Sequence, residues 1–139
     1  MKDYSFANTL VLVNGIEISG YDEGDDVINI TRLGDSASHL IGADGGMVVS
    51  LSSDRSGEIR FRLNQTSSSN IILSGLINAQ ENGAFVPVFI QFMDTKGLDL
   101  ASGTQGYMRR QPDMTRGVNS NSQEWTFVVE NLTMVLGGQ

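Results

Sequence analysis

The sequence predicts a mainly β domain, a β-barrel or sandwich of two packed antiparallel sheets, with one flanking α-helix. Several short segments alternate apolar and polar residues with a period of two, which is typical of strands with one buried face. Turn-forming Gly, Ser, Thr and Asn are abundant, whereas only 18% of the residues are charged. One segment, residues 70–82, carries an apolar stripe at helical spacing.

Length and charge narrow the possible functions. The 139 residues suit one domain, and neither a linker nor a repeat divides them, so residues 1–139 are expected to form a single unit. The formal net charge of −7 disfavours adhesion to DNA, RNA or anionic lipid. The absence of cysteine excludes disulfides and thiolate chemistry and fits assembly in a reducing cytoplasm. No apolar run is long enough for a signal peptide or membrane-spanning segment, which predicts a soluble, non-secreted protein.

The first predicted element is a hairpin over residues 6–20, because Asn14-Gly15 suits a two-residue type I′ turn. Residues Tyr21–Asp26 then gather four carboxylates around Gly24. Such a cluster can bind Ca²⁺, but its spacing is not that of an EF-hand, so a solvated acidic turn is the favoured interpretation. Residues 27–33 are the next predicted strand.

A long loop is predicted over residues 34–46, because the periodicity there is weak. It contains the one histidine, His39, which we interpret as an ordinary loop residue because no nucleophile or metal partner stands near it in the sequence. Leu40 and Ile41 are apolar and need cover, for which a neighbouring subunit is one possibility.

A second hairpin is predicted from strands over 47–52 and 58–64, joined by a loop at residues 54–57. In its first strand Met47, Val49 and Leu51 share one face. That face is expected to be buried, and the opposite face is expected to be wet.

The predicted helix follows this hairpin. Hydroxyls from residues 66–69 are available to cap its N-terminus, and Gly83 suits a left-handed C-cap. Its apolar stripe consists of Ile72, Leu73, Leu76 and Ile77. Ile71 lies on the polar side, so it is either exposed or in contact with another chain.

The remainder of the chain is predicted to be mostly strand and turn. The run 85–93 is nearly continuously apolar, which favours a strand covered on both faces. Residues 101–106 are expected to be a loop, 107–110 a short strand and 119–122 a polar turn. Residues 123–136 form the last predicted strand, with Trp125, Phe127 and Val129 on one face.

No catalytic, cofactor-binding or metal-binding residue is predicted. The sequence has no nucleophile elbow, zinc spacing or dinucleotide fingerprint, and the glycine-rich stretch 42–46 precedes a strand where a phosphate loop should precede a helix. Arg109 and Arg110 lie beside Tyr107, but in a chain of this net charge an ion-pairing edge at a protein interface is favoured over nucleic-acid contact. The protein is therefore not expected to be an enzyme.

An ordered set of short motifs resembles one family of proteins. The motifs are YSF (4–6), GADG (42–45), S-G-x-I-x-F-R-L (56–63), T-S-x-x-N (66–70), QPDM (111–114), E-W-x-F (124–127) and LGG (136–138). In this order they are similar to the tail-tube structural proteins of contractile-tailed bacteriophages, whose fold is shared with the tube proteins of type VI secretion systems.

The resemblance implies a structural protein of the virion tail, assembled in the bacterial host cytoplasm. Six copies would close into a ring, and stacked rings would form a hollow tube through which DNA passes without specific binding. Tail sheath, tape-measure and baseplate proteins are the further partners that it implies. A basic wall would hold DNA more tightly with every phosphate contact, so a neutral or acidic lumen is expected.

Two groups of site residues are predicted under this hypothesis. The lumen-facing candidates are Ser50, Ser52, Glu58, Arg60, Arg62 and Asn64. The inter-subunit candidates are Leu40, Ile41, Asp44, Ile71, Arg109 and Arg110. Arg60 and Arg62 should be paired with carboxylates, Glu58 or Glu130 being possible partners, because bare arginines would hold DNA. Loop 34–46 and the two termini are the candidates for ring-to-ring contacts.

Two other functions remain open from the sequence. One is a secretion-system tube of the same fold that passes effector proteins. The other is a monomeric β-sandwich module that binds carbohydrate or Ca²⁺ through the Asp22–Asp26 cluster.

Overall fold

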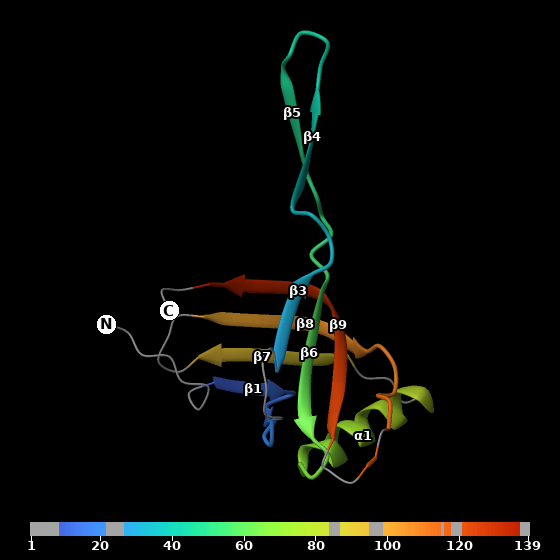
Figure 1. Cartoon of the computed structure of the whole chain (residues 1–139). Helices are drawn as coiled ribbons and strands as arrows, with labels where there is room; N and C mark the ends of the chain where they lie inside the picture. The colour runs from blue at the N-terminus through green and yellow to red at the C-terminus, as the bar shows by residue number, and fades with distance from the viewer. Residues whose placement is uncertain are drawn as a thin grey trace, which may run out of the picture.

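A computed structural model gives the fold and describes residues 9–21, 27–83, 87–94, 99–114, 116–117 and 121–136. Within these residues it contains nine strands and one helix (Figure 1). In chain order they are β1 (Thr9–Val13), β2 (Ile16–Glu17), β3 (Ile28–Arg32), β4 (Ala37–Ile41), β5 (Met47–Leu51), β6 (Gly57–Asn64), α1 (Ser69–Glu81), β7 (Val88–Asp94), β8 (Leu100–Met108) and β9 (Ser122–Val135). The acidic residues 22–26 lie outside the described part, as do residues 119–120 of the predicted polar turn.

Seven strands form one antiparallel sheet in the order β2-β1-β7-β8-β9-β6-β3. The sheet bends sharply, so that β1, β7 and β8 run across the direction of β3 and β6, and the long strand β9 follows the bend (Figure 1). The predicted class, mainly β with one flanking helix, is confirmed. The two layers that face each other are the halves of one continuous sheet.

The bend occurs where β8 and β9 each insert an irregularity. The alternation of inward-facing residues is interrupted there: on β8 the next inward-facing residue after Gly103 is Gly106, and on β9 the next after Val129 is Leu132. Gln105 has a positive φ of 55°. A Cβ at Gly103 would lie 2.7 Å from a methyl carbon of Val129. The predicted loop at 101–106 is therefore wrong. Its small residues allow the close approach of strands at a bend, and apolar periodicity cannot reveal such a strand.

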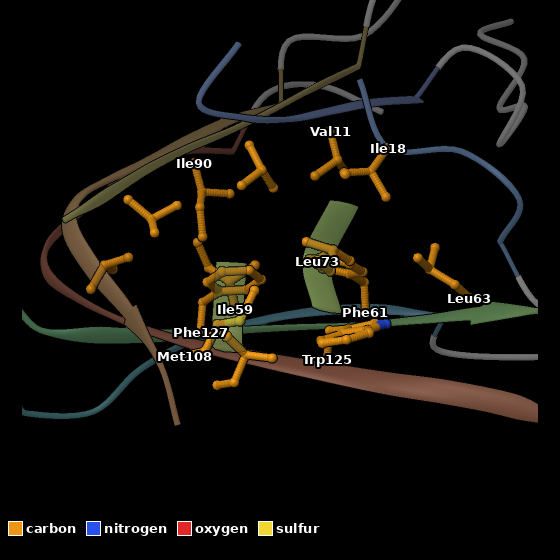
Figure 2. Packing of buried hydrophobic residues seen from close by; sticks show 14 of the residues in the cluster. Val11, Ile18, Ile59, Phe61, Leu63, Leu73, Ile90, Met108, Trp125 and Phe127 are labelled. Atoms are coloured by element: carbon orange, nitrogen blue, oxygen red, sulfur yellow. The ribbon is translucent and has the colours of Figure 1, made fainter. Parts of the chain in front are cut away.

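The hydrophobic core fills the space between the two halves of the sheet and α1 (Figure 2). The rings of Phe61 and Phe127 stack with their centroids 5.8 Å apart. Trp125 is buried and donates a hydrogen bond from Nε1 to Oδ1 of Asn70 in α1 at 2.9 Å. The predicted inward face of β9 is thus confirmed, and it packs against the helix through a satisfied indole.

The helix agrees with its predicted stripe. Leu73 and Ile77 are fully buried, Leu76 packs partly against the core, and Ile72 lies at the edge of the stripe with 37% of its surface exposed. Gly83 has a φ of 86°, as expected for a left-handed helix end. At the start, the side chain of the N-cap residue Ser68 makes no capping hydrogen bond, but the Ser67 hydroxyl accepts the Ser69 N–H at 3.2 Å, so one of the predicted hydroxyls does satisfy a helix N–H.

The predicted Asn-Gly turn joins β1 to β2 and is also hydrogen-bonded to β7. Asn14 and Gly15 both have positive φ values, 52° and 83°, as a type I′ turn requires. The Asn14 side chain accepts a hydrogen bond from the Phe89 N–H at 2.9 Å, which ties the turn to β7. The expectation that both faces of β7 are covered is wrong at Phe89, whose side chain is partly exposed, whereas Val88 and Ile90 are buried.

Candidate assembly surfaces

The most unusual surface of the molecule is a hairpin that projects away from the sheet (Figure 1). It is formed by β4 and β5, which pair with each other and with no other described strand. We call residues 37–51 the arm. All residues of both arm strands are exposed. Two predictions are wrong here: residues 37–41 are a strand instead of a loop, and β5 pairs with β4 instead of with β6.

The tip of the arm explains why the chain reverses there. The Gly42 N–H donates to the Gly46 carbonyl oxygen at 2.7 Å, and the Asp44 carboxylate accepts the Gly46 N–H at 2.9 Å. Gly45 has a φ of 84°, which glycine adopts without strain. Asp44, an inter-subunit candidate, therefore has a local role in closing the turn.

Apolar side chains cover most of one face of the arm. By register this face carries the cross-strand pairs Ala37–Leu51, His39–Val49 and Ile41–Met47. The opposite face carries Leu40 beside Val48, flanked by two serines. Leu40 is 71% exposed and Leu51 85% exposed, although an isolated two-stranded hairpin has little stability of its own in water. The arm thus has the composition of a buried hairpin but no cover from the described residues.

The outer face of β6 is the second candidate surface, and it is charged. Glu58, Arg60 and Arg62 alternate with the buried Ile59, Phe61 and Leu63. Glu58 forms an ion pair with Arg60, with 3.1 Å between Oε1 and Nε, and accepts a hydrogen bond from Arg109 Nη1 at 2.7 Å. The predicted pairing of Arg60 is confirmed. Arg109, an inter-subunit candidate, makes its ion pair within the chain.

The lumen-facing candidates do not form one group in the subunit. Glu58, Arg60, Arg62 and Asn64 alternate along β6, with Arg62 opposite Glu124 of β9. The proposed grouping with Ser50 and Ser52 is wrong, because it depended on pairing β5 with β6. Ser50 lies on the arm, and the Ser52 hydroxyl accepts the Asp54 N–H at 3.1 Å where the arm joins the sheet.

The inter-subunit candidates are also dispersed. Leu40, Ile41 and Asp44 lie on the arm, whereas α1, which carries Ile71, lies at the opposite end of the molecule (Figure 1). Ile71 is 77% exposed, so the prediction that the chain itself does not bury it is confirmed. Arg110 is exposed just after β8.

Sequence reasoning missed the arm as a unit, including Met47 and Val48. The signal that could have found it is the glycine-rich turn at 42–46, which lies midway between two short apolar segments.

The described residues provide no group of three or more His, Cys, Asp or Glu side chains that could hold a metal ion. Among them, no helix is long and apolar enough to cross a membrane. The main features of the described surface are therefore an apolar projecting hairpin and a charged outer sheet face.

Residues 1–137 of the chain match the family model described as the bacteriophage PhiTE tail tube protein. The chain belongs to this tail tube family. The resemblance predicted from the short motifs is thereby confirmed. A comparison with functionally curated proteins gives no significant match.

Solved structures of contractile injection systems share the tail tube fold. A chain of the sheath/tube terminator of the extracellular contractile injection system PVC, in the extended state, superposes with a TM-score of 0.67 at 12% identity, covering 97% of this chain and 98% of that one. The PVC sheath-tube complex gives 0.67 at 12% identity, with coverage of 96% and 92%. The tube-terminating cap of the anti-feeding prophage gives 0.64 at 13% identity, with coverage of 98% and 93%.

Proposed function

We propose that this chain is the repeating subunit of an inner tail tube, in which six copies close into a ring and rings stack into a conduit for DNA. Membership of the tail tube family and the fold shared with contractile injection systems support a tube role. The observation that carries the assembly proposal is the arm, whose apolar residues the described part of the chain leaves exposed.

The arm favours head-to-tail contacts between copies. It lies at one end of the molecule, and α1 lies at the other (Figure 1). A contact between two different surfaces of identical subunits is heterologous, so it propagates from copy to copy instead of ending at a pair. In the proposed tube the arm of one subunit packs on a copy in the neighbouring ring.

The edges of the sheet favour lateral contacts within a ring. The five-residue strand β3 lies at one edge and the two-residue strand β2 at the other. An edge strand leaves backbone N–H and C=O groups directed outward, and these associate readily with another strand. Closing six copies into a ring provides partners for both edges.

The charged outer face of β6 suits the wall of the lumen. Glu58 forms ion pairs with both Arg60 and Arg109, so each of these two arginines has a carboxylate partner. Pairing lowers the positive charge available to phosphates, and weak phosphate contact is what a DNA conduit needs. Within this proposal Glu58, Arg60, Arg62 and Asn64 line the lumen, and Ser50 and Ser52 do not.

The same proposal places the protein in the virion tail, as a structural subunit and not an enzyme. Assembly would take place in the host cytoplasm, on a baseplate and around a tape-measure protein. A contractile sheath would surround the finished tube. The fold shared with a chain of a sheath-tube complex supports a sheath partner.

Electron microscopy of the purified protein tests the proposal directly. The Ser52 N–H donates to the Ser36 carbonyl oxygen at 2.8 Å, so the ends of the arm are close enough for an Asn-Gly turn to replace residues 37–51. The wild-type protein should form rings or tubes in negative stain. The shortened protein should remain a folded monomer, because the arm contributes no side chain to the core.

Met114→Ser is the matched control, since it removes a comparably exposed apolar side chain outside the arm and should leave tubes intact. Long tubes from the shortened protein would contradict the proposed role of the arm. A wild-type protein that stays monomeric at high concentration would contradict the tube itself and would favour the binding-module hypothesis.

A secretion-type tube that passes proteins is the second candidate. The similarity to chains of extracellular contractile injection systems favours it specifically. Neighbouring genes for a capsid and a tape-measure protein would identify the phage tail, and their absence beside sheath and effector genes would identify the alternative.

A further inference from the structure

The arm is joined to the sheet by two segments, residues 33–36 and 52–56, which we call the arm base. The two segments are hydrogen-bonded to each other: the Leu33 N–H donates to the Ser56 carbonyl oxygen at 3.1 Å. Gly34 lies so close to Asp54 that a Cβ on the glycine would be 2.6 Å from a carboxylate oxygen. The arm base is therefore a closely packed junction and not a slack linker.

Leu132 of β9 lies at the centre of this junction. Its backbone N–H donates to the Arg55 carbonyl oxygen at 2.8 Å, and its own carbonyl oxygen accepts from Arg32 Nη2 at 2.6 Å. Its side chain is fully buried and packs so closely over Gly57 that a Cβ on that glycine would collide with the leucine side chain. Leu132 thus joins the core to the end of β3 and to the second segment of the arm base.

Arg32 is an unusual residue for this position. It ends β3, and its Nε is buried without a hydrogen-bond partner among the described residues. Burying part of a guanidinium is costly, so this contact is a poor means of raising stability alone. A charged donor bound to a carbonyl oxygen nevertheless gives a strong and directional hydrogen bond. Such a contact contributes chiefly to geometry.

A carboxylate on the other side of the base strengthens this arrangement. Asp54 accepts hydrogen bonds from the Ser56 N–H at 3.0 Å and from the Ser56 hydroxyl at 2.7 Å. These two bonds, with a smaller contribution from the attraction of Arg32, hold the pKa of the Asp54 carboxyl below its usual value. The Asp54 carboxylate of the arm base therefore lies near the positive charge of Arg32 at the end of β3.

We propose that Arg32 is a positioning residue that fixes the direction in which the arm leaves the sheet, by clamping the end of β3 to the Leu132 carbonyl oxygen. A fixed direction presents the apolar face of the arm to a neighbouring copy at a constant angle. The consequence for assembly rests on the proposed tube function. The fixed direction itself is a property of the single subunit and can be measured without assembly.

Pulsed electron paramagnetic resonance can measure the direction of the arm in dilute monomer. The chain has no cysteine, so Ala43→Cys at the tip and Glu124→Cys on β9 accept spin labels selectively. The labelled parent should give one narrow distance distribution. Arg32→Gln should broaden it about twofold, because the arm then pivots on the remaining backbone bonds of the base.

Arg55→Gln is the matched control. It removes a cation from the same base but keeps the backbone bond from Leu132, so the distribution should stay narrow. Arg32→Lys retains the positive charge and a hydrogen-bond donor group, so its distance distribution should have an intermediate width. If Arg32→Gln does not fold, the comparison of Arg32→Lys with the parent decides the outcome.

The inference would be overturned if folded Arg32→Gln gave a distance distribution as narrow as that of the parent. Where the glutamine variant does not fold, an equally narrow distribution from Arg32→Lys would overturn it. This outcome is distinct from failure of the proposed function. If Arg32→Gln broadens the distribution but the parent never forms tubes, Arg32 still positions the arm and the tube proposal is wrong.

Discussion

Strands β5 and β6 have the same alternating pattern in sequence, but the apolar face of β6 is buried and that of β5 is exposed. In β6 the alternating apolar residues Ile59, Phe61 and Leu63 are fully buried in the core (Figure 2). In β5 the alternating Met47, Val49 and Leu51 are exposed on the arm. Periodicity therefore identifies a face that must be covered, but it does not say which chain covers it. The body of the molecule covers its own apolar face, and we propose that a second copy covers that of the arm.

The largest expected effect tests this contrast on stability. Phe61→Ala should lower the free energy of unfolding of the monomer by about 3–5 kcal/mol, because it leaves a cavity beside Phe127 in the core. Val49→Ala on the arm should change it by less than about 0.5 kcal/mol. Denaturant unfolding of dilute protein measures both values. A similar loss for Val49→Ala would mean that the monomer covers the arm, which would remove the contrast.

The next effect concerns the bend that lets the sheet cover itself. Gly103→Ala should lower the free energy of unfolding by about 1–3 kcal/mol, because the added methyl group meets Val129 at the bend. Ser38→Ala on the exposed arm is the control and should be nearly neutral. Thermal and denaturant unfolding provide the measurement. An unchanged Gly103→Ala would show that the bend does not depend on close approach of the strands.

The smallest effect contrasts two outer surfaces: the arm, which we propose binds a second copy, and the face of β6, which we propose lines the lumen without holding DNA. Glu58→Gln should cost about 1 kcal/mol of stability, because the two arginines that it pairs with are well exposed although the Glu58 side chain itself is largely buried. It should, however, increase the binding of short duplex DNA at low salt, because Arg60 and Arg109 lose their shared carboxylate.

Fluorescence anisotropy with labelled DNA over a range of salt concentrations measures this change, and Glu81→Gln on α1 is a control of equal charge. Equal binding by the two variants would show that total charge matters and that the position of Glu58 does not.

Features set by neighbouring residues could be predicted from the sequence. The Asn14-Gly15 turn, the stripe of α1 and the inward face of β9 depend on residues a few positions apart, and all three are confirmed. The order of the short sequence motifs also predicts the tail tube family.

Features set by distant partners could not be predicted. The pairing of β5 with β4 instead of β6 depends on how two hairpins compete for one strand, and alternation alone fits both. Only residues 107–108 of β8 fall in a predicted strand; the rest of β8 could not be predicted because its glycines are required by Val129, a residue far along the chain. The role of Arg32 likewise depends on a carbonyl oxygen 100 positions away.

The open arm also has a consequence for how a tube could begin. The arm is exposed in the described part of the molecule, so the proposed polymerisation would not have to wait for the arm to be uncovered. A solution of such subunits would resemble a supersaturated solution, in which the number of seeds limits the growth of tubes. In the proposed tail the first ring on the baseplate would act as the seed, so the timing of elongation would depend on that platform and not on any switch inside the subunit.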